Sequence, residues 1–258
     1  MLTTSQKRQF AEEGYLKISG VIPMVMVEQA RRAINHSVGH VGKGKDDPDA
    51  HRNGQLGDDI RNTPVISDLF TKTPVMQIAE SLMGEGNVLP IGGAQIALRY
   101  PTSPEGDVGE PRGHLDGLGT GTNGMPKGVY KRGFTAFGVI YLDDVPEPYS
   151  GNFTVWPKSH TFFEDYFKRE GHEVLAQGMP RIELPEPPVM VTGRAGDFII
   201  AHHALVHTGG PNASPNVRYA TIARLKHKDC DANGVDVYTD IWREWAGVQA
   251  VMQEAVGA

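Results

Sequence analysis

The stretch GDFIIAHHALVHTGGPNASPNVR, residues 196–218, predicts a strand, a turn and a returning strand. Its first half is mainly apolar and ends at His207, while the run GGPNASPN is composed of residues that favour turns. The chain then returns along a mainly β-branched and apolar run, in which Arg218 and Ala220 share one strand face because side chains alternate with a period of two. An antiparallel hairpin therefore brings Arg218 back toward the strand that carries His207.

Seven short runs with strand character follow residue 86, and this hairpin supplies the last three of them. All are rich in β-branched and apolar residues and are bounded by Gly, Pro, Asn or Asp. They cover residues 95–100, 134–142, 153–156, 188–191, 197–201, 204–208 and 217–225. Because no helices alternate with them, the pattern favours an antiparallel sandwich or barrel over a parallel α/β sheet. We expect a mainly β fold with flanking helices.

Helical patterns lie on both sides of the β region, and residues 1–258 are interpreted as one domain. We divide it into a helical N-terminal preface (about 5–84), a β core (about 88–226) and a C-terminal helix (about 239–252). The other expected elements, in chain order, are a first helix with Ser5 as its N-cap, a strand-like run at 15–18, helices from Pro23 and Thr73, a surface loop at 41–59 and a helix at 161–170.

The composition is that of a globular protein, with 39% hydrophobic and 22% charged residues. A formal net charge of −6 gives no general attraction to nucleic acid, which we exclude as a partner. The sequence shows neither an N-terminal apolar leader nor an apolar stretch of the ~18 residues that cross a bilayer. We therefore expect a cytoplasmic protein without a membrane partner. The single cysteine, Cys230, is expected to be a free thiol.

A second informative stretch is HLDGLGTGTNG, residues 114–124, in which His114 and Asp116 form an H-x-D pattern. The pattern is expected by chance about 0.6 times in such a chain, and it occurs twice, the second time at His227 and Asp229. A metal bound here needs a third ligand, because two alternating side chains cannot close a facial site by themselves. The histidines downstream of His114 are His160, His172, His202, His203, His207 and His227.

The glycines of the same stretch do not form a phosphate loop, because no Gly-Lys-Ser/Thr closes the run. We interpret them as flexibility in a loop beside a metal. The second H-x-D is the weaker candidate, since no histidine follows His227 in the chain.

Four segments in this order resemble the phytanoyl-CoA dioxygenase family of Fe(II)- and 2-oxoglutarate-dependent oxygenases. They are the preface FAEEGYLKISGVIP, then HLD, then VWPKSH, and finally GDFIIAHHALVHTGGPN followed by an arginine eleven residues after the last histidine. The resemblance covers most of the chain from Phe10 to about Arg224. It implies a double-stranded β-helix, also called a jelly roll or cupin-like fold, which agrees with the strand pattern.

The resemblance also implies a set of site residues. His114, Asp116 and His207 correspond to the iron ligands, and Arg218 to the anchor of the far carboxylate of 2-oxoglutarate. Two further co-substrate contacts are expected at Gln95, on the strand before the H-x-D segment, and at Thr208. The chain departs from the family where a small hydroxyl residue often follows the distal histidine by two positions, because it has glycine there. It departs again where PGSH is replaced by PKSH.

The function implied is a dioxygenase that uses Fe(II), 2-oxoglutarate and O2, hydroxylates an unactivated C–H bond of a small organic substrate, and releases succinate and CO2. Asp116 argues against halogenation, because related halogenases lack this carboxylate. Two alternatives stay open at the sequence level. One is a zinc hydrolase that uses the same His/Asp/His ligands, and the other is a non-catalytic jelly-roll binding protein. Arg218 disfavours the first, and intact ligands disfavour the second.

Several other polar residues have a structural and a functional interpretation. His202 and His203 are expected to be buried or to lie behind the ligands, and His160 and Trp156 either line the pocket or pack in a turn. Arg99 and Arg224 are expected to be structural, with Arg99 able to face the cavity. The remaining candidates, which could meet an anionic substrate or stay solvated, are Lys127, Lys131 and Arg132 in the loop at 117–133.

Overall fold

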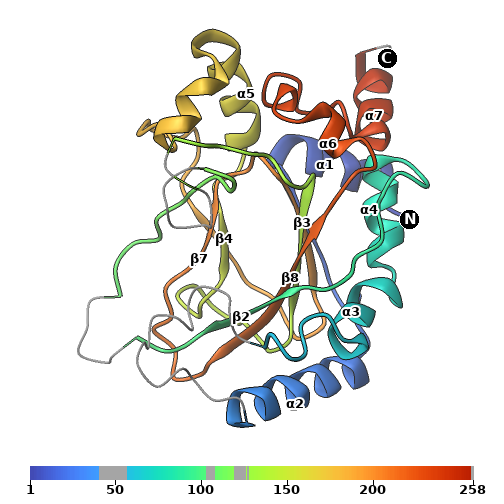
Figure 1. Cartoon of the computed structure of the whole chain (residues 1–258), viewed down its shortest axis with the longest axis vertical. Coiled ribbons are helices and arrows are strands. Elements are labelled where there is room, and N and C mark those ends of the chain that lie inside the picture. Colours follow the sequence, from blue (N-terminus) through green and yellow to red (C-terminus); the bar gives the residue numbers. More distant parts are fainter. Residues whose placement is uncertain (41–56, 103–107, 119–125, 127, 257–258) are drawn as a thin grey trace.

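Two antiparallel β-sheets form the centre of the computed structural model, which describes residues 1–40, 57–102, 108–118, 126 and 128–256 (Figure 1). The larger sheet has the strand order β1-β6-β3-β8-β2, and the smaller one has the order β5-β4-β7. The strands are β1 (Tyr15–Ile18), β2 (Gln95–Arg99), β3 (Ala136–Tyr141), β4 (Phe153–Val155), β5 (Val189–Val191), β6 (Phe198–His202), β7 (His207–Gly209) and β8 (Arg218–Leu225). The expected mainly β jelly roll with flanking helices is confirmed.

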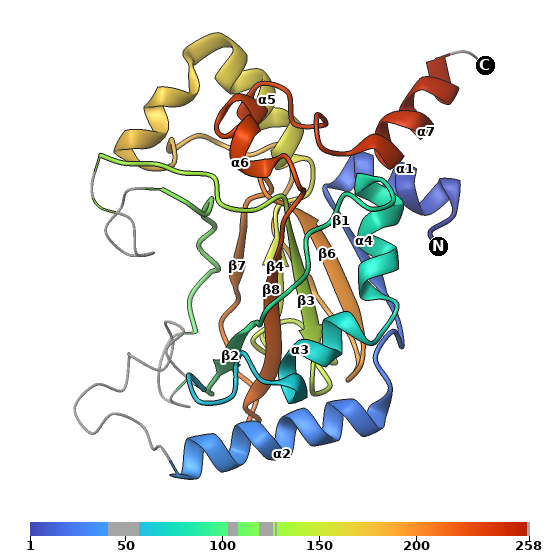
Figure 2. The same cartoon turned by 45° about the vertical axis from the view of Figure 1, so that its right-hand side comes forward.

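The helices are α1 (Thr4–Glu13), α2 (Met24–His40), α3 (Pro64–Thr71), α4 (Val75–Met83), α5 (Ser159–Glu170), α6 (Cys230–Asn233) and α7 (Ala246–Val256), with 3-10 turns at η2 (His172–Gln177) and η3 (Asp236–Tyr238). Helices α1–α4 and α7 cover the outer face of the larger sheet, the smaller sheet faces its inner side, and α5 and α6 lie at one end of the sheets (Figures 1 and 2). Among the described residues, none of these helices is long and apolar enough to cross a membrane.

The central strand β3 is buried on both faces, because one face packs on helices and the other on the second sheet. Ala136 and Ile140 belong to the core beneath the helices, whereas Phe137 and Tyr141 belong to the core between the sheets. This division follows the two-residue period of a strand. It also explains why this segment reads as continuously apolar in the sequence rather than alternating.

The preface contributes a strand to the larger sheet, so it is not a purely helical segment. Tyr15–Ile18 pairs antiparallel with Phe198–His202, next to the hairpin that carries the site. Helix α1 reaches this strand through Gly14, whose φ of +80° lies in the left-handed region that favours glycine. The cap of α1 differs from expectation: Thr3, not Ser5, accepts the Gln6 N–H, because Gln6 completes a capping box with Thr3.

The C-terminal region also differs from expectation. A helix at about 239–252 was predicted, but residues 239–245 are not helical and α7 begins only at Ala246. The short α6 and η3 precede this region and were not predicted. Trp242 and Trp245 lie in the turns before α7 and pack on Phe10 of α1, with ring centroids 6.3 and 4.9 Å from it. Packing of the two indoles on α1 thus stabilises a non-helical conformation in the residues before α7. The prediction also missed α3, which begins at Pro64.

The PKSH turn places Lys158 at φ +64°, ψ −3°, in the left-handed region. A glycine adopts this conformation without a Cβ penalty, whereas a lysine is strained there by roughly 1–2 kcal/mol. The replacement of glycine in this turn therefore has a local cost. The lysine makes contacts that a glycine cannot make, since its Nζ lies 3.0 Å from Glu186 Oε1.

Candidate metal centre

The H-x-D segment lies beside the start of β7, where it extends the smaller sheet by one rung. The backbone N–H of His114 donates to the carbonyl of His207 at 3.0 Å, and the N–H of His207 donates back at 3.1 Å. This antiparallel bridge aligns the two histidines directly across from each other. Asp116 follows His114 by two residues, so its side chain returns to the same side of the segment.

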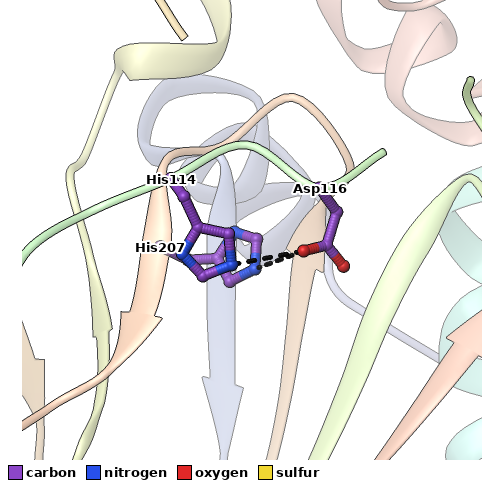
Figure 3. A group of neighbouring side chains, drawn as sticks. All are labelled: His114, Asp116 and His207. Atoms are coloured by element: carbon purple, nitrogen blue, oxygen red, sulfur yellow. Dashed lines mark ion pairs between the residues drawn. The ribbon is translucent and has the colours of Figure 1, made fainter. Parts of the chain in front are cut away.

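The three predicted ligands converge (Figure 3). His114 Nε2 lies 3.2 Å and His207 Nε2 lies 3.8 Å from Asp116 Oδ1. One ligand atom from each residue can be chosen so that all lie within 4.8 Å of one another. Two imidazole nitrogens and one carboxylate oxygen on one side of a point form the facial arrangement typical of non-haem Fe(II) sites.

His207 is held in the form that a metal requires. Its Nδ1 donates to the carbonyl of Leu205 at 2.9 Å, which leaves Nε2 as the free lone pair toward Asp116. The ring is buried and packs against Phe137, with centroids 4.1 Å apart. Burial lowers the pKa of His207 to about 4, so the imidazole is neutral at pH 7.

Asp116 is a carboxylate in this setting. Burial raises its pKa, but a hydrogen bond with His114 and the charges of His207 and Arg224 hold the pKa of Asp116 well below its usual range. Its second oxygen, Oδ2, accepts a hydrogen bond from Arg224 Nη2 at 2.9 Å. The arginine therefore orients the carboxylate so that Oδ1 points to the histidines.

Arg224, which the sequence interpretation assigned to structure, contacts a candidate metal ligand. Its guanidinium lies over Phe134 and Phe137, with distances of 5.4 and 5.1 Å to the ring centroids. It also approaches Gln95, whose Oε1 lies 3.5 Å from Nη1. A signal was available, because Arg224 is an even number of residues from Arg218 and so shares its strand face.

We predict that Arg224→Gln weakens Fe(II) binding by roughly 10–100-fold, the usual effect of losing a partner that orients a metal ligand. Fe(II) titration of the apoprotein under anaerobic conditions measures this. The matched control is Arg243→Gln, because Arg243 Nε bonds Asp240 Oδ2 at the same 2.9 Å on an exposed surface. Equal Fe(II) affinity in the two variants would contradict the role given to Arg224.

Polar and small side chains lie on the inner face of β2 near this cluster. On β2, Ile96 and Leu98 are buried beneath the helices, whereas Gln95, Ala97 and Arg99 face the other sheet and are only half-buried. Ala97 lies directly across from Ala220 of β8. Small side chains on both strands leave room on the inner face, and Gln95 has the inward position expected for it.

Arg218 lies on the same inner face and is 5% exposed. Its Nε donates to the carbonyl of Gly151 at 2.7 Å and its Nη1 to the carbonyl of Ala97 at 2.9 Å. Burial, with a smaller effect of nearby Arg99, lowers its pKa to about 10, so it stays charged at pH 7. No carboxylate in the described part of the chain pairs with it. Because buried charges are normally paired, Arg218 is the candidate contact for an anion on this face.

Other predicted residues lie elsewhere. Thr208 alternates away from His207 and lies across from Thr154 on the outer face, because only His207 and Gly209 of β7 point inward. Trp156 lines a groove with Val206 and the segment 179–187, on the sheet face opposite the ligands. Arg132 is neither solvated nor available to a substrate, since it is buried in an ion pair with Glu244. Lys131 is exposed, and Lys127 lies outside the described residues.

His172 bonds the Tyr130 hydroxyl through Nδ1 at 2.7 Å. Three other histidines form a buried cluster, and tryptophans pack against two of them. His202 Nε2 donates to the carbonyl of Ile241 at 3.0 Å, and its ring stacks on Trp245 with centroids 5.0 Å apart. His160 Nε2 donates to the carbonyl of Ala11 at 3.1 Å, and burial lowers the pKa of His160 to about 4. His203 is 5% exposed. None of them joins the ligand cluster, in agreement with the structural interpretation.

The second H-x-D pattern forms no metal site among the described residues. His227 Nδ1 accepts the N–H of Asp229 at 3.1 Å, so the histidine closes a local turn. The Asp229 side chain is 57% exposed. The His114/Asp116 pattern thus differs from the His227/Asp229 pattern in having a third candidate ligand, His207, beside it.

The fold and this donor set define a jelly-roll metalloprotein with a two-histidine, one-carboxylate site. The chain belongs to the phytanoyl-CoA dioxygenase family, because the model of that family, Phytanoyl-CoA dioxygenase (PhyH), matches residues 10–220. The match contains both ligand segments and Arg218, and it confirms the family resemblance seen in the sequence. No curated protein is significantly similar to the chain.

Solved structures share the fold at low sequence identity. The non-heme alpha ketoglutarate dependent epimerase SnoN from nogalamycin biosynthesis is 22% identical with a TM-score of 0.57, over 86% of this chain and 79% of that one. HygX from Streptomyces hygroscopicus, with nickel and 2-oxoglutarate bound, is 18% identical with a TM-score of 0.57, over 88% of each chain. AviO1 from Streptomyces viridochromogenes Tue57 is also 18% identical, with a TM-score of 0.57 over 89% of this chain and 98% of that one.

Proposed function

We propose that the protein is an Fe(II)- and 2-oxoglutarate-dependent dioxygenase that hydroxylates a C–H bond of a small organic molecule. The observation that carries the proposal is the convergence of His114, Asp116 and His207, whose ligand atoms lie within 4.8 Å of one another. Family membership and the neighbours crystallised with iron or with 2-oxoglutarate support the same assignment.

The residues present fit both groups. Neutral imidazoles and one carboxylate on one side of a point suit Fe(II) and leave positions for a chelating keto acid. Arg218 offers a planar guanidinium to a carboxylate at the other end of the same inner face, and the Ala97–Ala220 pair leaves space along the way. When bound, iron supplies the reaction of O2 with 2-oxoglutarate that gives succinate, CO2 and an oxidised substrate.

The chain's own groups position and shield this chemistry. Arg224 holds Asp116 at 2.9 Å, and the Leu205 carbonyl holds His207 through Nδ1 at 2.9 Å. Phe137 and Phe153 cover the His207 ring, with centroids 4.1 and 5.8 Å from it. These apolar contacts exclude water from one side of the ligands and favour reaction with the bound substrate over side reactions.

A zinc hydrolase on the same ligands and a non-catalytic binding protein are less well supported. Neither uses a buried arginine that has no carboxylate partner in the described part of the chain.

A small-molecule substrate is part of our proposal, as a related epimerase was solved in complex with nogalamycin RO. Three cations of the loop at 117–133 were candidates for contact with an anionic substrate. Among the described residues, Lys131 is exposed and could make this contact, whereas Arg132 is buried. The buried free thiol of Cys230 suits a cytoplasmic location.

The test is anaerobic visible absorption of the apoprotein during addition of Fe(II) and then 2-oxoglutarate. We expect a weak charge-transfer band that needs both, because the keto acid must chelate iron to produce it. Substrates are then screened by succinate release, and incorporation of oxygen from 18O2 into the product identifies hydroxylation. No band, with zinc bound tightly instead of iron, would support the hydrolase or the binding protein.

A further inference from the structure

A second arginine lies beside Arg218 on the inner face of the sheet. Arg99 of β2 pairs across the strands with Arg218 of β8, at a position where both side chains point toward the smaller sheet. Gly151 lies between their stems, since a Cβ added to Gly151 would come within 2.9 Å of Arg99 Cβ and 3.1 Å of Arg218 Cβ. The two arginine stems therefore lie side by side on β2 and β8, which are neighbouring strands (Figure 1).

The absence of a side chain at Gly209 lets the Arg99 guanidinium contact β7, the strand that carries His207. Arg99 Nη2 donates to the Gly209 carbonyl at 2.9 Å. A Cβ at position 209 would lie 2.5 Å from Nη2 and 2.6 Å from Nε, closer than real Cβ contacts allow. Any other residue at 209 would therefore displace the guanidinium.

The guanidinium is also at a suitable distance from the metal ligands. His207 and Gly209 are two residues apart on one strand face, which corresponds to about 7 Å. This spacing is comparable to the length of a five-carbon dicarboxylate. A keto acid chelated beside His207 thus has its far carboxylate near both Arg99 and Arg218.

We propose that Arg99 is a second cationic contact for the far carboxylate of 2-oxoglutarate, and that Gly209 is the residue that makes room for it. The inference rests on the proposed function and extends it to the basis of co-substrate selection. Within the family a small hydroxyl side chain often occupies the position of Gly209. In this chain the Arg99 guanidinium, which comes from β2, fills that space. A carboxylate between two guanidinium groups also offsets their mutual repulsion, so the pair favours a dicarboxylate over a 2-oxo acid with an apolar end.

The test compares two keto acids in the anaerobic titration of the Fe(II) protein. One is 2-oxoglutarate, and the other is 2-oxopentanoate, which has a methyl group in place of the far carboxylate. Arg99→Gln removes the charge and keeps a polar side chain on β2. We expect it to raise the Kd of 2-oxoglutarate by about tenfold or more and to leave the Kd of 2-oxopentanoate within about twofold. Arg31→Gln, an arginine on α2 paired with Asp143, is the matched control and is expected to change neither.

A second variant tests the role of the glycine. Gly209→Ala is expected to raise the Kd of 2-oxoglutarate in the parent protein and to add little in the Arg99→Gln background, because both changes remove one contact. Full additivity would overturn the part assigned to Gly209. A 2-oxoglutarate Kd unaffected by Arg99→Gln, or an equal loss for both keto acids, would overturn the part assigned to Arg99. No charge-transfer band in the parent protein would instead overturn the proposed function, and this inference with it.

Discussion

Replacing His207 by alanine is expected to abolish the charge-transfer band formed with Fe(II) and 2-oxoglutarate and to reduce turnover below detection. Without the imidazole, His114 and Asp116 remain as a two-ligand pair on one flexible segment, which cannot hold a facial site. Fe(II) affinity should fall by more than the roughly 100-fold that loss of an outer partner can cost. Anaerobic Fe(II) titration and succinate release measure the two effects.

Two control variants show whether an effect comes from loss of the ligand itself. One removes a histidine elsewhere in the chain, and the other breaks the second H-x-D pattern. His36→Ala changes an exposed histidine on α2, and Asp229→Ala breaks the second H-x-D at an exposed carboxylate. Both should retain Fe(II) affinity and turnover. Because His207 packs against Phe137, the unfolding midpoint of each variant is measured in parallel. Full activity in a folded His207→Ala protein would disprove the ligand assignment.

Replacing Arg218 by alanine is expected to raise the Kd of 2-oxoglutarate on the order of 100-fold, since hydrogen bonds to charged groups contribute about 1.5–3 kcal/mol each. Fe(II) binding without the keto acid should be unaffected, because the arginine makes no contact with the ligands. The charge-transfer titration reports the first quantity and Fe(II) titration the second.

Arg218→Lys is the companion variant, because alanine also leaves the carbonyls of Gly151 and Ala97 without their donors. Lysine keeps the charge but not the planar fork, so we expect an intermediate Kd in a protein that unfolds at the parent midpoint. An unchanged Kd in both variants would move the co-substrate anchor away from Arg218.

The strands were predictable because they depend on local patterns, and the candidate ligands followed from the resemblance of short motifs to the family. The segments that became β2, β3, β4 and β8 alternate or are continuously apolar over short lengths, and glycine, proline or aspartate bounds them. The H-x-D pattern and the histidine before the GGPN turn lie at strand termini, where neighbouring chains meet. These features are the same in any compact antiparallel arrangement of the strands, so the sequence could indicate them without knowledge of the distances between residues.

Contacts between segments far apart in the sequence were less predictable. Arg224 bonds Asp116, 108 residues earlier, and Arg99 bonds Gly209, 110 residues later. The sequence suggested structural roles for both arginines, because a strand arginine usually forms a salt bridge or is solvated. The pairing of the preface strand with β6 and the turns around Trp242 and Trp245 likewise depend on which surfaces pack together.

The sequence alone determined the class of fold, because short apolar runs bounded by turn residues favour antiparallel strands. Its resemblance to the family then pointed to the candidate ligands and to Arg218. Only the tertiary structure decided which His-x-Asp pattern lies beside a third histidine, which arginine bonds Asp116 and which guanidinium lies against Gly209. Each of those outcomes depends on the register between strands that are distant in the chain. Register is set by the packing of the whole core rather than by any local pattern.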